Sequence, residues 1–391
     1  MYTLALVFHP QGENHKRAGA ASSKSKAAPA GKLMPKTVSH IWDEIARFSN
    51  LALAYQRTCR GQRFGAGAVV FNVNLEENLF ALELQLRQRT WGPSPFREFV
   101  IHEPKLRLVQ APAFCDRVVH QAVMHHAAPV FERRFIHDSY ANRVGFGTHQ
   151  ASHRLRAFMR SASSKWAHPY AIKADIKSYF PSIPHDLLML RVRRLFTDPG
   201  VLWFFERVIT GCGLVGKGLP IGSLTSQWLA NLYLDTLDHH AKENLGIRYY
   251  LRYMDDFIVV GQNKAWCRDM LHRLEDFVQS LQLALNPKTS IMPLSSGVDF
   301  VGYRHWADHV LPRKRTVARA RRSFRSMQRR YAAGQIDLDF IRARVASFTG
   351  YMRHCDGHRS TMAILGDFVL CRHPEKKDLE ISTKNLTSCE S

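Results

Sequence analysis

Two adjacent carboxylates between two apolar arms are the feature that most constrains this chain. The stretch from Arg248 to Gly261 reads RYYLRYMDDFIVVG and places aromatic and β-branched residues on both sides of Asp255 and Asp256. Such residues favour strands, so the stretch predicts a hairpin with the acids at its tip. Acids in an apolar hairpin are costly to bury unless a cation neutralises them, and Mg²⁺ is the usual cation for phosphate chemistry. An ordinary Asp-Asp turn would explain the stretch alone equally well.

Two other stretches give the hairpin a context. Residues 170–183 (YAIKADIKSYFPSI) predict a short strand that ends in Asp175 and turns into a helix, and residues 218–231 predict a glycine-containing loop before a helix. An acid on one strand, a glycine loop with its helix and an Asp-Asp hairpin follow in the order of a polymerase palm. In this order the chain resembles a reverse transcriptase. The resemblance implies an α+β right-hand polymerase with fingers, a palm whose antiparallel sheet packs on helices, and a helical thumb.

The charge of the chain indicates a polyanionic partner. Of the 391 residues, 55 are Lys or Arg and 33 are Asp or Glu, which gives a net charge of +22. That excess suits a nucleic acid, although a structural RNA-binding protein would show it as well. An apolar content of 45% argues for a folded protein rather than a basic disordered one.

The cysteines and the apolar runs bear on the compartment. Seven scattered cysteines without a Cys-x-x-Cys motif indicate reduced thiols, so we expect a cytoplasmic protein. A zinc site made of residues 354–358 with Cys371 and His373 is the weaker alternative, because its spacing is irregular. No apolar run reaches membrane-spanning length, and the first residues lack the basic start of a signal peptide, so no membrane partner is expected.

Composition and periodicity predict how the chain is divided. Helical spacing of apolar residues recurs over residues 37–56, 75–89 and 265–283, and residues 97–111 alternate like a β-hairpin. A helix opens near Asp116, a plausible cap. The expected divisions are a disordered extension (1–35), fingers with N-terminal helices (36–165), the palm (166–306), a basic helical thumb (307–372) and a flexible tail (373–391).

The palm chemistry follows from the acids. Nucleotidyl transfer needs an activated 3′-hydroxyl and a neutralised pyrophosphate, and two metal ions supply both when carboxylates from separate segments converge. Asp175, Asp255 and Asp256 are the predicted catalytic and metal-binding residues. The resemblance adds the backbone carbonyl of Ile176. The expected cofactor is a pair of Mg²⁺ ions, with Mn²⁺ as a possible substitute.

The resemblance also assigns residues to the incoming nucleotide. Arg107 and Arg117, with Lys105, match the basic fingers residues that clamp the triphosphate, although a solvated basic hairpin would look the same. Phe180, five positions after Asp175, matches the aromatic residue that excludes a 2′-hydroxyl and so favours dNTPs, although an ordinary core aromatic would fit there. Lys288 matches a lysine proposed to protonate the pyrophosphate. Gly222 and Gln227 would lie against the nascent pair.

A further set of residues is assigned to the template and primer. Ser226 would face the template beside Ile221, and Arg143 would line the template or nucleotide path. Residues around Gly302 resemble the primer grip, a hairpin that presses the primer end toward the metals. The complete predicted set is Arg143, Ile221, Ser226, Tyr253, Met254, Gly302 and Tyr303.

One departure from the common family pattern points to a subgroup. Most reverse transcriptases have Gln before the loop glycine and Ser-Pro at its end, whereas this chain has Ile221-Gly222 and Ser226-Gln227. The variant resembles the reverse transcriptases of diversity-generating retroelements, which copy a template RNA with errors at adenines. The implied partners are an RNA template, a DNA or RNA primer, dNTPs and a small basic helical accessory protein.

Two alternatives stay open at this level. One is a retron or antiphage-defence reverse transcriptase with the same chemistry and another RNA. The other is a non-catalytic, maturase-like RNA-binding protein, against which the three intact carboxylates argue. No RNase H, integrase, endonuclease or protease motif is visible in the sequence, so we expect a compact bacterial or phage enzyme.

Overall fold

A computed structural model describes residues 37–61, 65–102, 106–211 and 215–371 of the chain. Helices alternate with short sheets, and the strand pairs β1–β2 and β7–β8–β9 are antiparallel. The fold is therefore α+β, as the sequence predicts. The expected disorder of residues 1–35 and 373–391 and the role of Lys105 lie outside the described residues. No helix in the described ranges is long and apolar enough to cross a membrane.

The chain separates into two compact units. Unit 1 comprises Met1–Gly147, Ala174–Ile258 and Arg268–Ser290, and unit 2 comprises Thr148–Lys173, Val259–Cys267 and Ile291–Ser391. The three predicted catalytic acids all belong to unit 1. The predicted primer grip and thumb belong to unit 2.

The N-terminal part of unit 1 is a helical layer with a hairpin. The predicted helix over residues 37–56 is divided at Arg47, whose extended backbone separates two helices. The hairpin appears as predicted, and α5 begins at Phe114, so Asp116 is inside the first turn and is not the cap. Asp116 instead accepts a hydrogen bond from the backbone N–H of Ser94 (2.9 Å). The elements are α1 (Trp42–Ala46), α2 (Phe48–Cys59), α3 (Ala66–Val73), α4 (Leu75–Arg87), β1 (Arg97–Ile101), β2 (Arg107–Ala111) and α5 (Phe114–Glu132).

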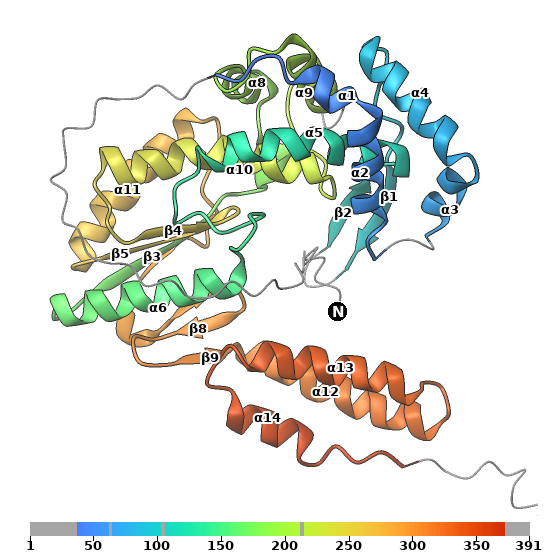
Figure 1. The fold of residues 1–391 in the computed structure, drawn as a ribbon. Helices are drawn as coiled ribbons and strands as arrows, with labels where there is room; N and C mark the ends of the chain where they lie inside the picture. Colours follow the sequence, from blue (N-terminus) through green and yellow to red (C-terminus); the bar gives the residue numbers. More distant parts are fainter. Residues whose placement is uncertain (1–36, 62–64, 103–105, 212–214, 372–391) are drawn as a thin grey trace, which may run out of the picture. The chain divides into compact units, whose positions relative to one another are not determined.

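The middle of the chain contains the strands that carry the acids. A four-stranded sheet has the order β4-β5-β3-β6. Figure 1 shows α5 and α10 side by side, and α10 packs on β4, where the Tyr250 hydroxyl donates to Asp238. The elements are β3 (Tyr170–Asp175), α7 (Tyr179–Ser182), α8 (His185–Arg193), α9 (Pro199–Thr210), α10 (Leu224–His239), the π-helical turn His240–Asn244, β4 (Tyr250–Tyr253), β5 (Asp256–Gly261), α11 (Lys264–Ser280) and β6 (Ser290–Pro293).

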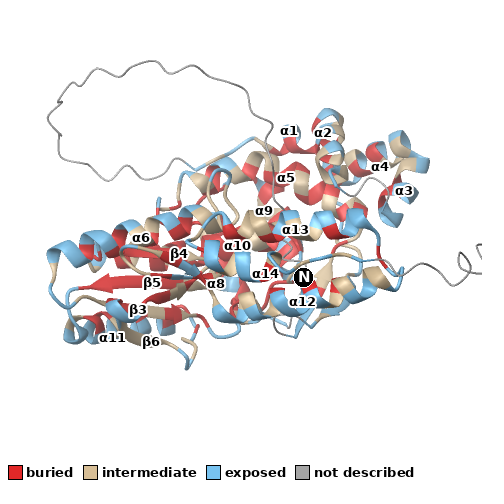
Figure 2. Ribbon diagram, turned by 90° about the horizontal axis from the view of Figure 1, so that it is seen from below, coloured by how far each residue is buried: buried red, intermediate tan, exposed pale blue. Residues whose placement is uncertain are grey.

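Burial explains why these segments are strands and helices. Nearly every residue of β4 and β5 is buried, as the red ribbons of Figure 2 show. A strand covered on both faces reads as a continuous apolar run, which is the pattern of Phe257–Val260. α10 is likewise buried around most of its circumference. The sheet and α10 therefore form a rigid base for the acids at the strand ends.

Unit 2 combines a long helix, a small sheet and a helical group. The predicted strand pair around Gly302 appears with a third strand, and the predicted basic helix is α12. Helices α12 to α14 enclose a small apolar core that includes Phe324, Ile341 and Phe348. The elements are α6 (Thr148–Lys165), β7 (Val298–Phe300), β8 (Tyr303–His305), β9 (Val310–Pro312), α12 (Lys314–Ala332), α13 (Leu338–Met352) and α14 (His358–Leu365).

Candidate active site

The β4–β5 turn presents the first pair of acids. β4 ends at Tyr253 and β5 begins at Asp256, so Met254 and Asp255 form a two-residue turn. Met254 adopts a left-handed backbone (φ +55°), a conformation that tight hairpin turns require and that few side chains favour. The amide of Asn142 donates to the Met254 sulfur (3.1 Å), which fixes the side chain of the strained residue. Asp255 is thus held at the tip of a rigid hairpin.

The end of β3 brings the third acid to the same place. The N–H of Ile176 donates to the Asp255 carbonyl (3.3 Å), so β3 and the turn meet directly after Asp175. Asn286 holds Asp175 from the other side, because its N–H donates to the Asp175 carbonyl (2.7 Å) and its amide to Oδ2 (2.9 Å). Carboxylates that are far apart in sequence therefore converge, as the sequence predicts.

Electrostatics at this point show an excess of negative charge. Burial, followed by the charge of Asp175 and to a lesser extent that of Asp256, raises the pKa of Asp255 to about 7. The two neighbouring acids therefore lie close enough to act on Asp255 electrostatically. Crowded carboxylates of this kind form a site that a cation would stabilise.

The donor set fits a divalent cation. Asp175, Asp255 and Asp256 offer only oxygen donors, the ligands that Mg²⁺ and Mn²⁺ prefer. In the described part of the chain no three His, Cys, Asp or Glu side chains already stand in a metal-ligating arrangement. The fit is supported by the backbone contact between Ile176 and Asp255, which brings the end of β3 to the turn directly after Asp175. Ile176 contacts the turn through its N–H, which donates to the Asp255 carbonyl.

A buried ion pair holds the backbone of the β4–β5 turn. Arg252 and Asp238 are both fully buried, and the guanidinium donates to both carboxylate oxygens (2.7 and 2.6 Å). The same guanidinium donates to the carbonyl of Met254 (2.8 Å), to Asn231 (3.1 Å) and to Ser139 (3.1 Å). Arg252 thus ties α10 to the residue immediately before Asp255.

The glycine loop contacts the fingers hairpin. Gly222 has φ +129°, and a Cβ atom there would come within 3.0 Å of Val109 and 3.1 Å of the Gln110 carbonyl. The Gln110 N–H also donates to the carbonyl of Ile221 (2.8 Å). The backbone at Gly222 therefore comes close to β2, and the predicted contact of Gly222 with the nascent pair stays a prediction.

The basic residues of the fingers differ in their surroundings. Arg107 is exposed on β2 at the loop end of the hairpin, where it pairs in register with Ile101. Arg117 lies on the first turns of α5 with its guanidinium over the ring of Phe114 (5.2 Å), and burial lowers its pKa. Arg107 is therefore available to an anion, whereas Arg117 is partly packed.

The predicted gate residue lies beside the glycine loop. Phe180 is half-buried in the short helix α7, five positions after Asp175, and its carbonyl accepts from the N–H of Leu219 (2.9 Å). The neighbouring Tyr179 is fully buried and donates to the Ala230 carbonyl on α10. Phe180 is therefore held between the β3 acid and the glycine loop, with part of its ring exposed.

Four residues assigned to the template or primer make contacts within the protein. Arg143 is almost fully buried and donates to Glu132 (2.8 Å) and to the carbonyls of Ile136 and Ser139 (2.7 Å each), so it fastens its own loop. Its ring contacts with Phe135 and Phe146 close the same cluster. This guanidinium is used within the protein, which differs from the predicted template path.

Ser226 and Tyr303, also assigned to the template or primer, are both buried. Ser226 has no exposed surface because it lies on an inward face of α10, whereas Gln227 is half-exposed. In unit 2 the ring of Tyr303 stacks on Tyr351 (4.7 Å) and its hydroxyl donates to the Tyr351 carbonyl (3.0 Å).

The fourth, Gly302, is bonded within unit 2, because its carbonyl accepts from the Tyr351 hydroxyl (2.6 Å). Its φ of +96° is one that glycine tolerates best. These contacts join the predicted primer grip to α13. Lys288, by contrast, is exposed after the segment that holds Asp175.

Residues that sequence reasoning missed are those that hold the acids. Asn286 and Asp238 carry no motif, and their partners are far away in the chain. A signal existed only for Arg252, since a charged residue inside an apolar strand needs a buried partner.

Fold and site together define a class of protein. An α+β chain whose three acids meet at a strand end and a hairpin tip is a palm-type nucleotidyl-transferring polymerase. The family profile described as Reverse transcriptase (RNA-dependent DNA polymerase) matches residues 101–305. The chain belongs to the reverse transcriptase family.

Two proteins that are similar to this chain share about a quarter of its residues over the aligned parts. Protein YkfC of Escherichia coli K12 is 26% identical over 283 residues, which are 61% of this chain and 74% of YkfC. The group II intron-encoded protein LtrA of Lactococcus lactis subsp. cremoris is 26% identical over 181 residues, 42% of this chain and 28% of LtrA. The chain thus spans less than a third of LtrA.

Solved structures include telomerases. One from Candida albicans with a fragment of telomeric RNA has a TM-score of 0.44 and 10% identity, and covers 64% of this chain and 55% of that chain. One from Candida tropicalis has a TM-score of 0.44 and 13% identity, and covers 59% of this chain and 58% of that chain.

Proposed function

We propose that the chain is an RNA-directed DNA polymerase that makes cDNA by nucleotidyl transfer at Asp175, Asp255 and Asp256. The observation that carries this proposal is that β3 meets the β4–β5 turn directly after Asp175, where the Ile176 N–H donates to the Asp255 carbonyl (3.3 Å). Family membership supports an RNA template. The exposed Arg107 supports contact with a triphosphate.

The residues of the chain have separable tasks in this proposal. The three carboxylates would hold two divalent cations, which when bound supply the charge that activates the 3′-hydroxyl and neutralises the leaving pyrophosphate. Asn286 and Arg252 fix the positions of Asp175 and the turn. Phe180, half-exposed beside Asp175, would pack under the sugar of the incoming nucleotide and so favour dNTPs.

The experiment is primer extension on an RNA template with Mg²⁺ and dNTPs. Wild type should make cDNA, and the double variant Asp255→Ala, Asp256→Ala should make none while it still binds the template–primer. Extension that persists in the double variant would contradict the proposed site. Wild type that binds the duplex but stays inactive, even with its native RNA and neighbouring proteins, would favour the non-catalytic RNA-binding alternative.

We further propose that copying is error-prone at template adenines, as in diversity-generating retroelements. The support is the Ile221-Gly222 and Ser226-Gln227 variant of the loop, together with the position of Ile221. Its carbonyl is fixed on β2 while its side chain stays half-exposed. A small basic helical accessory protein is the partner that this subgroup implies.

Sequencing of the cDNA tests the subgroup. Wild type should misincorporate mainly opposite adenines, and Ile221→Gln should lower that error rate severalfold, whereas the apolar control Ile221→Leu should not. Errors spread evenly over the four template bases would instead favour a retron or defence enzyme.

A further inference from the structure

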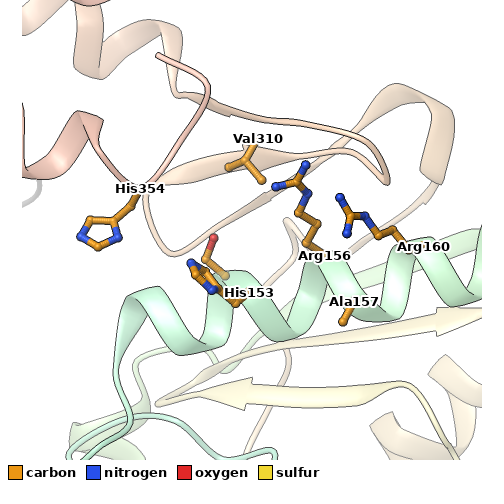
Figure 3. Close-up of a pocket in the computed structure, with 7 residues that line it drawn as sticks. His153, Arg156, Ala157, Arg160, Val310 and His354 are labelled. Atoms are coloured by element: carbon orange, nitrogen blue, oxygen red, sulfur yellow. The ribbon is translucent and has the colours of Figure 1, made fainter. Parts of the chain in front are cut away.

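A small basic pocket in unit 2 lies apart from the residues assigned above. It measures about 210 Å³ and is lined by α6, by β9 and by the segment after α13. Figure 3 shows Arg156 and Arg160 rising from α6 toward Val310, with His153 and His354 beside each other. A pocket of this size is smaller than those that hold whole cofactors or drug-sized ligands, so it suits one small group.

The two arginines of the pocket are held in place by the backbone. Arg156 donates through Nη2 to the Asp308 carbonyl, and Arg160 donates through Nε to the Ala307 carbonyl (2.9 Å). The Nε of Arg156 is buried and has no hydrogen-bond partner among the described residues. Each guanidinium carries five N–H donors, so both keep donors for a ligand and are already oriented.

Histidines border the pocket. The ring of His354 stacks on His149 with centroids 3.4 Å apart, and burial, followed by the charges of His354 and His153, lowers the pKa of His149. A lowered pKa favours the neutral imidazole. The fixed positive charge of the pocket therefore comes from its two arginines.

The pocket lining contains no carboxylate that could satisfy these cations. Two acids belong to the flanking segments, and both are engaged. Asp308 pairs with His309 (2.8 Å), and Asp356 accepts from the N–H of Val310 (2.8 Å). The remaining lining groups are Ser152, which donates to His305 (2.7 Å), and Ala157.

We propose that this pocket binds one backbone phosphate of a nucleic-acid strand. Oriented guanidiniums match the tetrahedral oxygens of a phosphate better than a point charge does, and the pocket has room for the phosphate but not for a base. The same unit carries the arginine-rich helix α12, whose exposed face provides further contacts along a strand. The proposal takes from the proposed function only that the ligand is a nucleic acid.

The test changes the charge of the pocket without removing a hydrogen bond. Ala157 is exposed on α6, so Ala157→Glu adds one negative charge to the lining, and Ala157→Gln is the control of equal size. The full chain is titrated with an RNA–DNA template–primer duplex in EDTA, by fluorescence anisotropy, over a series of salt concentrations. Ala157→Glu should weaken binding on the order of tenfold relative to Ala157→Gln.

A second variant and a modified ligand locate the contact. Arg160→Gln should lower the slope of log K against log[salt] by about one phosphate contact, whereas Arg193→Gln, an exposed arginine of unit 1, should not. Neutral methylphosphonate linkages placed one at a time along each strand should reveal one position that weakens wild type. That penalty should shrink in Arg160→Gln.

Equal duplex affinities of Ala157→Glu and Ala157→Gln would overturn the phosphate pocket, and so would a wild type that binds no duplex in low salt. Poly-glutamate is titrated as a polyanion without phosphate. If Ala157→Glu weakens the binding of poly-glutamate but not that of the duplex, the pocket binds acidic peptides instead, and the proposal is wrong. Because the titration contains no metal and needs no turnover, a chain that binds through this pocket but does not polymerise would count against the proposed function alone.

Discussion

At the scale of single residues, the site depends on groups that never touch a substrate. Arg252 is fully buried, contacts Asp238 through both carboxylate oxygens and supports the Met254 carbonyl beside Asp255. Burial raises the pKa of Asp238, and the charge of Arg252 opposes that shift. Removal of either partner would leave an unpaired charge in the core.

The prediction for this pair separates stability from positioning. Arg252→Met should lower the free energy of unfolding by about 3–5 kcal/mol in urea titrations, and the double variant with Asp238→Asn should lose less than the sum of the single variants. Arg252→Lys should recover part of the stability but not the rate of nucleotide incorporation, because an ammonium cannot contact Asp238 and Met254 together. A lysine variant with the wild-type rate would contradict the positioning role.

The sequence predicts the acids better than their supports. Asp175, Asp255 and Asp256 follow apolar strands in a recognisable order, and a strand leaves few choices for where its end points. Asp238 and Asn286 depend on how α10 and the segment after α11 pack, which local pattern does not encode. The resemblance assigns Ser226 to the template, but α10 is buried on most faces, so the rotation of this helix cannot be read from periodicity.

At the scale of elements, the C-terminal end of α10 is built around a charged histidine. His239 contacts Asp235 (3.4 Å) and Glu243 (2.6 Å), and its neighbourhood, the Asp235 carboxylate first, raises its pKa to about 9. A cation also suits the end of a helix, where the carbonyl groups are unpaired.

The raised pKa of His239 predicts a pH dependence of stability. Because the folded pKa lies above the usual 6.5, the stabilisation is complete below about pH 6.5 and is lost as the pH rises through about 9. His239→Gln should cost about 1–2 kcal/mol at pH 6.5, allowing for solvent screening, and almost nothing at pH 10. Unfolding titrations across this range measure the effect. His272→Gln, from an exposed His–Asp pair on α11, is the control, and equal pH profiles of the two variants would contradict the prediction.

Helices and strands were predictable from the sequence where the spacing of their apolar residues was regular. The hairpin over residues 97–111 and the helices α4 and α11 appear close to their expected bounds. The break at Arg47 and the start of α5 before Asp116 were not predicted, because the first depends on packing and the second on a hydrogen bond from Ser94 that belongs to another segment.

At the scale of the whole molecule, unit 1 carries the three carboxylates and unit 2 is strongly basic. Family membership gives the type of reaction, and the loop around Ile221 gives the proposed subgroup. The predicted primer grip is bonded to α13 through Tyr303 and Tyr351, so any strand that contacts α13 is mechanically linked to that hairpin.

Single-turnover incorporation of one dNTP into a preformed RNA–DNA template–primer is the most direct test of the central claim. Asp175→Asn and Asp255→Asn, which keep the shape of the side chain, should each lower the rate by about 10²–10³-fold or more with duplex affinity unchanged. The matched control Asp269→Asn, an exposed acid of α11 paired with Arg273, should keep the wild-type rate. Asparagine variants that incorporate as fast as this control would contradict the assignment of these carboxylates as the catalytic centre.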